Sequence, residues 1–187
     1  MASPVVLLLP GWQNSGPAHW QSRWEQCYGD LRVEQHDWMR ALRGDWIARL
    51  EEVVLEQSVP CVLVAHSLGC MLTAAWAAVS RNTHKVQGAL LVGPGDPERE
   101  ALRTVLPSWS PVVLRPLPFP STLVGSRDDP YCDIARAQAF ARAWGSTWVD
   151  YGARGHLNAD SGLGDWPEGR VFVDSLLAGC STPPAQP

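Results

Sequence analysis

The sequence predicts an α/β domain, a three-layer sandwich built on a mainly parallel sheet of six strands. Short apolar runs alternate along the chain with longer segments of helical periodicity. Several of these runs are continuously apolar, as strands covered on both faces must be. A chain of 187 residues can bury one substantial core, so we expect one domain over residues 1–180 and a flexible tail over 181–187.

The six predicted strands are short apolar runs, and the five predicted helices follow from apolar spacings of three and four residues. The strands are Val5–Leu9, Leu31–Gln35, Cys61–Ala65, Gly88–Val92, Ser121–Val124 and Thr147–Tyr151. The helices are Ala18–Cys27, Asp45–Gln57, Leu68–Ser80, Asp133–Trp144 and Gly169–Leu177. The segment Gly93–Pro120 contains seven prolines, which predicts an irregular loop with one helical turn near Glu98–Arg103. We expect this loop to shape one wall of a pocket.

Composition excludes several classes of function. The net charge of -4 and the scattered basic residues argue against a nucleic-acid or membrane-surface partner. The segment Met1–Pro10 has no basic leader and is too short to span a membrane, so we expect a cytoplasmic protein. Five widely spaced cysteines without a CxxC pair favour reduced thiols. The histidines lack metal-ligand spacing and no phosphate loop is present, so we expect no metal and no cofactor.

The strongest chemical signal is the pentapeptide Ala65-His66-Ser67-Leu68-Gly69, which lies directly between a predicted strand and a predicted helix. Small residues on both sides of a serine at such a junction are typical of a nucleophile elbow, because the chain must turn sharply there. The alternative is that Ser67 only caps the helix, since serine is a favoured N-cap residue.

A carboxylate and a histidine follow the two last predicted strands. Asp128 and Asp129 come directly after Ser121–Val124, and His156 lies on a glycine-bearing loop after Thr147–Tyr151. Residues at the carboxyl ends of parallel strands face one crevice. The order serine, aspartate, histidine is the order of the α/β-hydrolase triad, so we expect Ser67 as nucleophile, His156 as base and an aspartate as its partner. From the residues alone either aspartate qualifies, because the other can form the turn and cap the next helix.

Two backbone N–H groups are expected to bind a developing oxyanion. The Leu68 N–H lies at the start of the helix that follows the elbow. The second donor is assigned to Trp12, in the loop after the first strand, where Gly11 permits close approach of the backbone. His66 is expected to shape the pocket rather than act as the base. Trp20 and Trp109 are candidate pocket walls, although each is also explained by packing.

With these residues in hand, the chain resembles the retinoblastoma-binding-protein and YdeN type of small serine hydrolase, a minimal branch of the α/β hydrolases. The resemblance spans nearly the whole chain and rests on Leu9-Pro10-Gly11-Trp12 with Ser15, His19 and Trp20, on His66-Ser67-Leu68-Gly69, on residues 126–130 and on Gly155-His156. It implies a six-stranded sheet without a large lid and assigns the triad acid to Asp129.

The resulting hypothesis is hydrolysis of a small ester or amide through an acyl-enzyme, with part of the substrate apolar. Two alternatives stay open. The protein is a binding module that retains a hydrolase fold and docks a protein partner, or it is an acyltransferase that uses the same triad. Fold analogy alone does not distinguish them.

Overall fold

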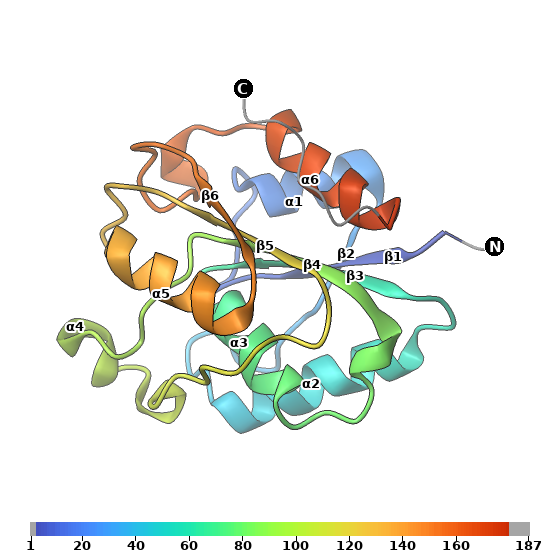
Figure 1. The fold of residues 1–187 in the computed structure, drawn as a ribbon, viewed down its shortest axis with the longest axis horizontal. Coiled ribbons are helices and arrows are strands. Elements are labelled where there is room, and N and C mark those ends of the chain that lie inside the picture. The colour runs from blue at the N-terminus through green and yellow to red at the C-terminus, as the bar shows by residue number, and fades with distance from the viewer. Residues whose placement is uncertain (1–2, 180–187) are drawn as a thin grey trace.

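The computed structural model describes residues 3–179, and within them six parallel strands form one sheet in the order β2-β1-β3-β4-β5-β6 (Figure 1). The strands are β1 (Val5–Leu9), β2 (Leu31–Arg32), β3 (Cys61–His66), β4 (Val86–Val92), β5 (Ser121–Gly125) and β6 (Thr147–Asp150). Every neighbouring pair is parallel. All the carboxyl ends therefore lie at one edge of the sheet, where the loops that follow them meet.

Helices cover both faces of the sheet and complete the predicted three-layer sandwich (Figure 1). Helices α1 (Trp20–Tyr28) and α6 (Pro167–Leu177) lie on one face. Helices α2 (Arg43–Glu56), α3 (Leu68–Ala77) and α5 (Ile134–Trp144) lie on the other. The remaining helical elements are α4 (Glu100–Arg103) and three short 3₁₀ turns at Thr83–Lys85, Pro107–Trp109 and Ala159–Ser161.

The alternation of side chains along the strands explains why their sequences are continuously apolar. In β1, Leu7 and Leu9 enter the core beneath α2 and α3, whereas Val6 and Leu8 enter the core beneath α1 and α6. Successive residues of a strand point to opposite faces. Because helices cover both faces of the sheet here, every position of β1 is apolar.

The second strand is shorter than predicted, because β2 covers only Leu31–Arg32 rather than Leu31–Gln35. It is an edge strand that pairs only with β1, and one further bond runs from the Val33 N–H to the Leu8 carbonyl at 2.9 Å. The next donor along β1 falls on Pro10, which has no N–H. The ladder therefore stops, and the apolar character of Val33 reflects burial in the core.

Other boundaries differ from the predictions by two or three residues. Helix α1 begins at Trp20 rather than Ala18, because His19 is the N-cap and its Nδ1 accepts from the Gln21 N–H at 3.1 Å. Helix α3 ends three residues earlier than predicted, α2 and α6 each begin two residues earlier, and β4 begins two residues earlier. Such shifts arise where capping and tertiary contacts override local pattern.

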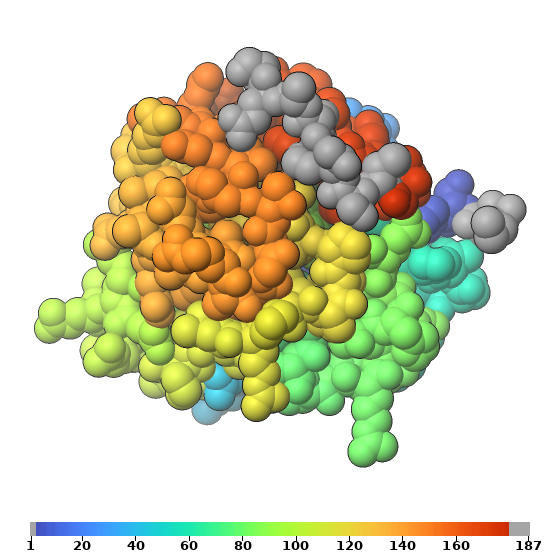
Figure 2. Space-filling view, in the orientation of Figure 1, coloured from blue at the N-terminus to red at the C-terminus, as the bar shows by residue number. Residues whose placement is uncertain are grey.

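The proline-rich segment 93–120 is irregular, as predicted, and its one α-helical turn is α4. It projects from one side of the molecule, where Figure 2 shows it in lime green. Arg136 of α5 fastens its base, because the guanidinium contacts the carboxylates of Asp96, at 3.2 Å, and Glu98. Within residues 3–179 no helix is long and apolar enough to cross a membrane. The tail predicted over 181–187 lies outside the described residues.

Two glycines give a matched test of the packing at the elbow. A Cβ added at Gly69 would lie 2.2 Å from the Leu9 carbonyl oxygen, whereas one added at Gly44, in α2, would meet nothing within 4 Å. We expect Gly69→Ala to lower the free energy of unfolding by about 2 kcal/mol or more. We expect Gly44→Ala to raise it by about 0.5–1 kcal/mol. Urea unfolding measures both, and equal effects of the two substitutions would contradict this packing.

Candidate active site

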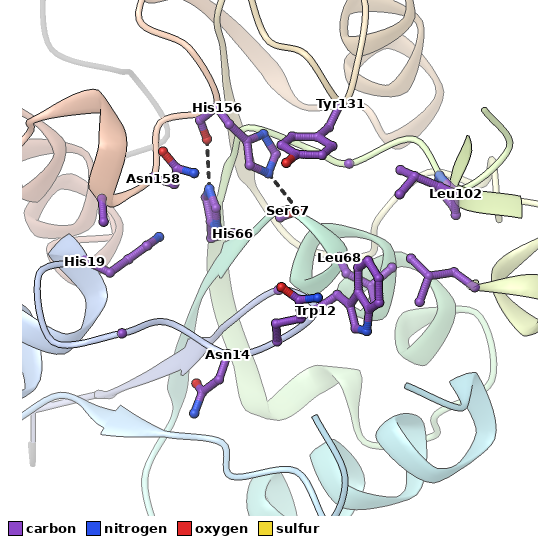
Figure 3. Close-up of a pocket in the computed structure, with 17 residues that line it drawn as sticks. Trp12, Asn14, His19, His66, Ser67, Leu68, Leu102, Tyr131, His156 and Asn158 are labelled. Carbon is purple, nitrogen blue, oxygen red and sulfur yellow. Dashed lines mark hydrogen bonds between the residues drawn. The ribbon is translucent and has the colours of Figure 1, made fainter. Parts of the chain in front are cut away.

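Three side chains that are distant in the sequence meet at the carboxyl edge of the sheet. Ser67 follows β3, Asp129 follows β5 and His156 follows β6. The His156 Nε2 lies 2.9 Å from the Ser67 Oγ (Figure 3). Its Nδ1 lies 2.9 Å from both carboxylate oxygens of Asp129. The acid is buried, with 2% of its side chain exposed. The three residues expected to form a triad are therefore linked by hydrogen bonds.

The backbone at Ser67 is strained. Its φ of 54° and ψ of -119° lie where a residue with a Cβ rarely falls. Although Ser67 precedes α3, its hydroxyl makes no capping bond to the helix and instead contacts His156. This geometry argues against the capping alternative and matches the turn expected of a nucleophile elbow.

The two neighbouring aspartates have different tasks. Asp129 faces His156 and also accepts from the Tyr131 N–H at 2.8 Å. Asp128 instead accepts from the Gly155 N–H at 2.7 Å and the Ser126 hydroxyl at 2.8 Å. These hydrogen bonds lower the pKa of the Asp128 carboxyl. Asp128 thus ties the acid loop to the histidine loop, and Asp129 is the partner of His156.

Two buried donors hold the backbone of the histidine loop. The His66 Nε2 lies 2.9 Å from the His156 carbonyl oxygen, and because a carbonyl only accepts, this nitrogen carries the proton. The Trp20 Nε1–H donates to the Leu157 carbonyl at 2.8 Å. Leu157 itself is left-handed, with φ of 51°. These two hydrogen bonds therefore fix the position of the loop that carries the imidazole.

Two further histidines at the site are held in the neutral form. Burial, helped by the nearby Arg32 and His156, lowers the pKa of His19 to about 3. Burial and the neighbouring imidazoles of His19 and His156 lower the pKa of His66 well below its usual value. Neither ring can carry charge at neutral pH, so neither competes with His156 for the Asp129 carboxylate.

Two backbone N–H groups lie free beside the nucleophile. Among the described residues, neither the Trp12 nor the Leu68 N–H donates to a protein acceptor. The approach is close, because a Cβ at Gly11 would lie 2.7 Å from the Ser67 Cβ, and one at Gly95 would lie 3.1 Å from the Ser67 Oγ. Glycine at both positions leaves room for a substrate carbonyl.

A cavity of about 400 Å³ opens beside Ser67 (Figure 3). Its apolar lining includes Trp12, Pro97, Leu102 and Leu106, and its polar lining includes His19, His66 and Asn158. The proline-rich segment supplies part of the apolar wall, as expected. Gly11 and His66, the other two residues considered for the pocket from the sequence, are also part of the lining.

Two tryptophans proposed as pocket walls belong to the core instead. Trp20 is 1% exposed and packs edge-on against Trp24 and Trp166. Trp109 is 2% exposed, and its Nε1–H donates to the Ala41 carbonyl at 2.7 Å. Neither lines the cavity. Their large apolar surface is better buried between a helix layer and the sheet than at the mouth of a pocket.

Sequence reasoning missed several residues of the site, among them Tyr131, Gly95 and Asn158. The Tyr131 ring is tilted against that of His156 with centroids 4.6 Å apart, Gly95 borders Ser67, and Asn158 lines the cavity. Tyr131 and Asn158 each lie two residues after a predicted triad member, and Gly95 follows the end of β4. Their position after strands that end at the same edge was the available signal.

The buried thiols near the site are not rival nucleophiles. The Cys70 Sγ donates to the Val92 carbonyl at 3.5 Å, and burial raises the pKa of both Cys70 and Cys132. A thiol becomes a nucleophile only as the thiolate. Within residues 3–179 no group of three histidine, cysteine or acidic side chains is arranged to hold a metal ion.

Comparison with known proteins gives one family. A family model described as serine hydrolase matches residues 6–175. A YdeN-like hydrolase from Pectobacterium atrosepticum has 28% identity and a TM-score of 0.83, with 94% of this chain and 91% of that chain covered. The ydeN gene product of B. subtilis has 16% identity and a TM-score of 0.74, with 94% and 100% covered. An esterase from Rhodococcus sp. has 18% identity and a TM-score of 0.65, with 93% and 91% covered.

No curated protein matches the sequence. The structural neighbours support the YdeN part of the resemblance, and they do not bear on its retinoblastoma-binding-protein part. Those with less than 25% identity show the fold alone, that of a small α/β hydrolase, which over residues 3–179 of this chain has six strands and no large lid.

The neutral histidines predict how stability depends on pH. The pKa of His19 falls from 6.5 in the unfolded chain to about 3 when folded. Below about pH 6.5 the unfolded chain therefore binds more protons, and the free energy of unfolding decreases as the pH falls. At pH 5 this single group costs about 2 kcal/mol relative to pH 7.5.

Urea unfolding at pH 7.5 and pH 5 measures this effect. We expect His19→Asn, which keeps a favoured N-cap residue, to reduce the loss at pH 5 by about that amount. The control His36→Asn, at an exposed histidine, should leave the loss unchanged. The same loss at pH 5 in wild type and His19→Asn would show that His19 is not held neutral.

Proposed function

The chain belongs to the serine hydrolase family, and from this we propose that it cleaves a small ester or amide through an acyl-enzyme on Ser67. The observation that carries the proposal is the continuous chain of hydrogen bonds from Ser67 through His156 to Asp129, beside a cavity. A nucleophile, a base and a group that orients the base are what acyl transfer requires.

Attack begins with transfer of the hydroxyl proton. The His156 Nε2, at 2.9 Å, takes the proton of Ser67 as the Oγ forms a bond to the substrate carbonyl carbon. Asp129 accepts from the Nδ1–H, which leaves Nε2 free as the base and stabilises the imidazolium that forms. Because the carboxylate is buried and close, its orienting effect is strong.

The tetrahedral intermediate places negative charge on the former carbonyl oxygen. The N–H groups of Trp12 and Leu68 are its proposed donors, since both are free and lie beside Ser67. Such a donor contributes roughly 3–4 kcal/mol in well-studied hydrolases. Folding already orients the Leu68 N–H, because the turn at Ser67 fixes the start of α3. No free energy is then needed to orient this donor during the reaction.

The intermediate then collapses with cleavage of the bond to the leaving group. His156 gives its proton to the departing oxygen or nitrogen, and the acyl group stays on the Ser67 Oγ. Water, deprotonated by His156, attacks the acyl carbon in the second half, and Ser67 leaves as a free hydroxyl. The products are an acid and an alcohol or amine.

The cavity favours this function over a protein-binding module. A docking surface needs no pocket beside a nucleophile, whereas about 400 Å³ is the size of a small-ligand pocket. Pro97, Leu102 and Leu106 supply apolar contact, which fits a substrate with one apolar group.

A fluorophosphonate probe tests the nucleophile. We expect stoichiometric labelling of wild type at Ser67 and none of Ser67→Ala. Ser67→Gly should also resist labelling and be more stable than Ser67→Ala, because glycine accepts a φ of 54° without strain. Labelling that persists in both folded variants would place the reactive group elsewhere.

A pair of substitutions tests which of the two aspartates is the acid of the triad. We expect Asp129→Asn to lower kcat by about 10³- to 10⁴-fold, because an amide cannot stabilise the imidazolium. Asp128→Asn should cost less than about tenfold, since its remaining Oδ1 can still accept from Gly155 and Ser126. Steady-state hydrolysis of a common ester measures both, and equal losses would be the contrary result.

A further inference from the structure

One buried nitrogen at the site has no hydrogen-bond partner. Within residues 3–179 only two buried side-chain polar atoms lack one, the His19 Nε2 and the Gln35 Oε1. His19 is 4% exposed and its ring lines the cavity beside Ser67. Buried polar groups without partners are rare in folded proteins, and at a site they mark a place for a ligand.

The proton on this nitrogen is fixed by the other side of the ring. The His19 Nδ1 accepts from the Gln21 N–H, so it carries no proton. A neutral imidazole then has its hydrogen on Nε2. The group at the cavity wall is therefore an N–H donor without charge, and it has no acceptor.

A second donor lies at the same end of the cavity. The Asn158 Oδ1 accepts from the Asp160 N–H at 3.1 Å and the Ser161 hydroxyl at 3.5 Å, so its NH₂ group is left free. Figure 3 shows Asn158 and His19 on the same side of His66. His66 adds no free donor, because its Nε2–H is given to the His156 carbonyl.

The charge of the residues that line the cavity limits which chemical groups can bind there. No lysine or arginine is among the described residues that line this cavity. A carboxylate placed there would contact no cation of the lining, and Arg32, which lies near His19, already pairs with Glu25, so burying that charge is costly. A neutral acceptor, such as a carbonyl oxygen, can accept hydrogen bonds from both donors without the cost of burying a charge.

The two ends of the cavity lie on opposite sides of Ser67 (Figure 3). Leu102 and Trp12 lie on one side, and His19 and Asn158 on the other. As general acid, His156 must reach the leaving atom. Figure 3 shows His66 and Asn158 on one side of His156 and Tyr131 on the other, and only the first side carries free neutral donors. We therefore place the leaving group at the polar end.

We propose that His19 and Asn158 form a polar subsite that selects substrates whose leaving group carries a neutral carbonyl, while the acyl group lies against Leu102 and Trp12. This inference rests on the proposed function and names the substrate class of the same site. His19 and Asn158 are specificity-determining residues here, because they contact the substrate away from the reacting atoms.

Three matched esters test it. They are butanoates of alcohols that share a three-carbon linker and end in an acetyl group, an isopropyl group or a carboxylate. The acetyl and isopropyl ends have nearly the same shape and differ in one hydrogen-bond acceptor. In wild type we expect kcat/KM for the acetyl ester to exceed that for the isopropyl ester by about tenfold, and the carboxylate ester to be the poorest.

Two variants test whether His19 and Asn158 cause the preference for the acetyl ester. His19→Ser keeps a favoured cap for α1 and removes the ring N–H, and Asn158→Asp keeps the Oδ1 contacts and replaces the NH₂ with an oxygen. Each should bring the acetyl-to-isopropyl ratio toward one, whereas His36→Asn and Gln26→Glu, both exposed, should keep the wild-type ratio. The ratio is taken within each protein, so a general change in activity cancels, and circular dichroism verifies folding.

The outcomes separate this inference from the proposed function. If all three esters are cleaved in a Ser67-dependent way but wild type shows no preference for the acetyl ester, the subsite is wrong and the hydrolase stands. A preference that both variants retain also overturns it, and one folded variant is sufficient for that comparison. If none of the esters is cleaved, the proposed function and the subsite fail together.

Discussion

The left-handed turn at Ser67 is the constraint on which the rest of the site depends. A φ of 54° at a residue with a Cβ is unfavourable, and it persists because the surroundings leave no alternative. Gly69 packs against the Leu9 carbonyl and Gly11 packs against Ser67, so β1, the turn and α3 fix one another. The strain projects the hydroxyl from the edge of the sheet and aligns the N–H groups at the start of α3.

Buried polar side chains hold the histidine loop in position. His66 and Trp20 donate to carbonyls of the histidine loop, which fixes where the imidazole of His156 lies. These rings sit among tryptophans in an apolar core, and burial keeps His66 neutral. Part of the tryptophan-rich core thus supports the loop that carries the base, while the strands supply stability through continuous apolar packing.

The loops at the carboxyl edge, rather than the strands, supply much of the cavity lining. The proline-rich segment after β4 supplies Leu102 and Leu106, the loop after β1 supplies Trp12, and the loop after β6 supplies Asn158. Loops at the carboxyl edge can change without disturbing the strands, which is why one fold hosts many specificities. In this chain they give the cavity an apolar end and an end with neutral donors.

By itself the sequence determined the α/β class, the six strands and the residues at the ends of β3, β5 and β6, because apolar periodicity and strand-end motifs are local signals. Local pattern left Asp128 and Asp129 undecided, and only the family resemblance favoured Asp129. The sequence also offered Trp20 and Trp109 as candidate pocket walls beside the packing alternative. The contacts that distinguish these alternatives are visible only in the tertiary structure. Which carboxylate faces an imidazole, and whether an aromatic ring lines a cavity or fills a core, depends on contacts between segments far apart in the chain.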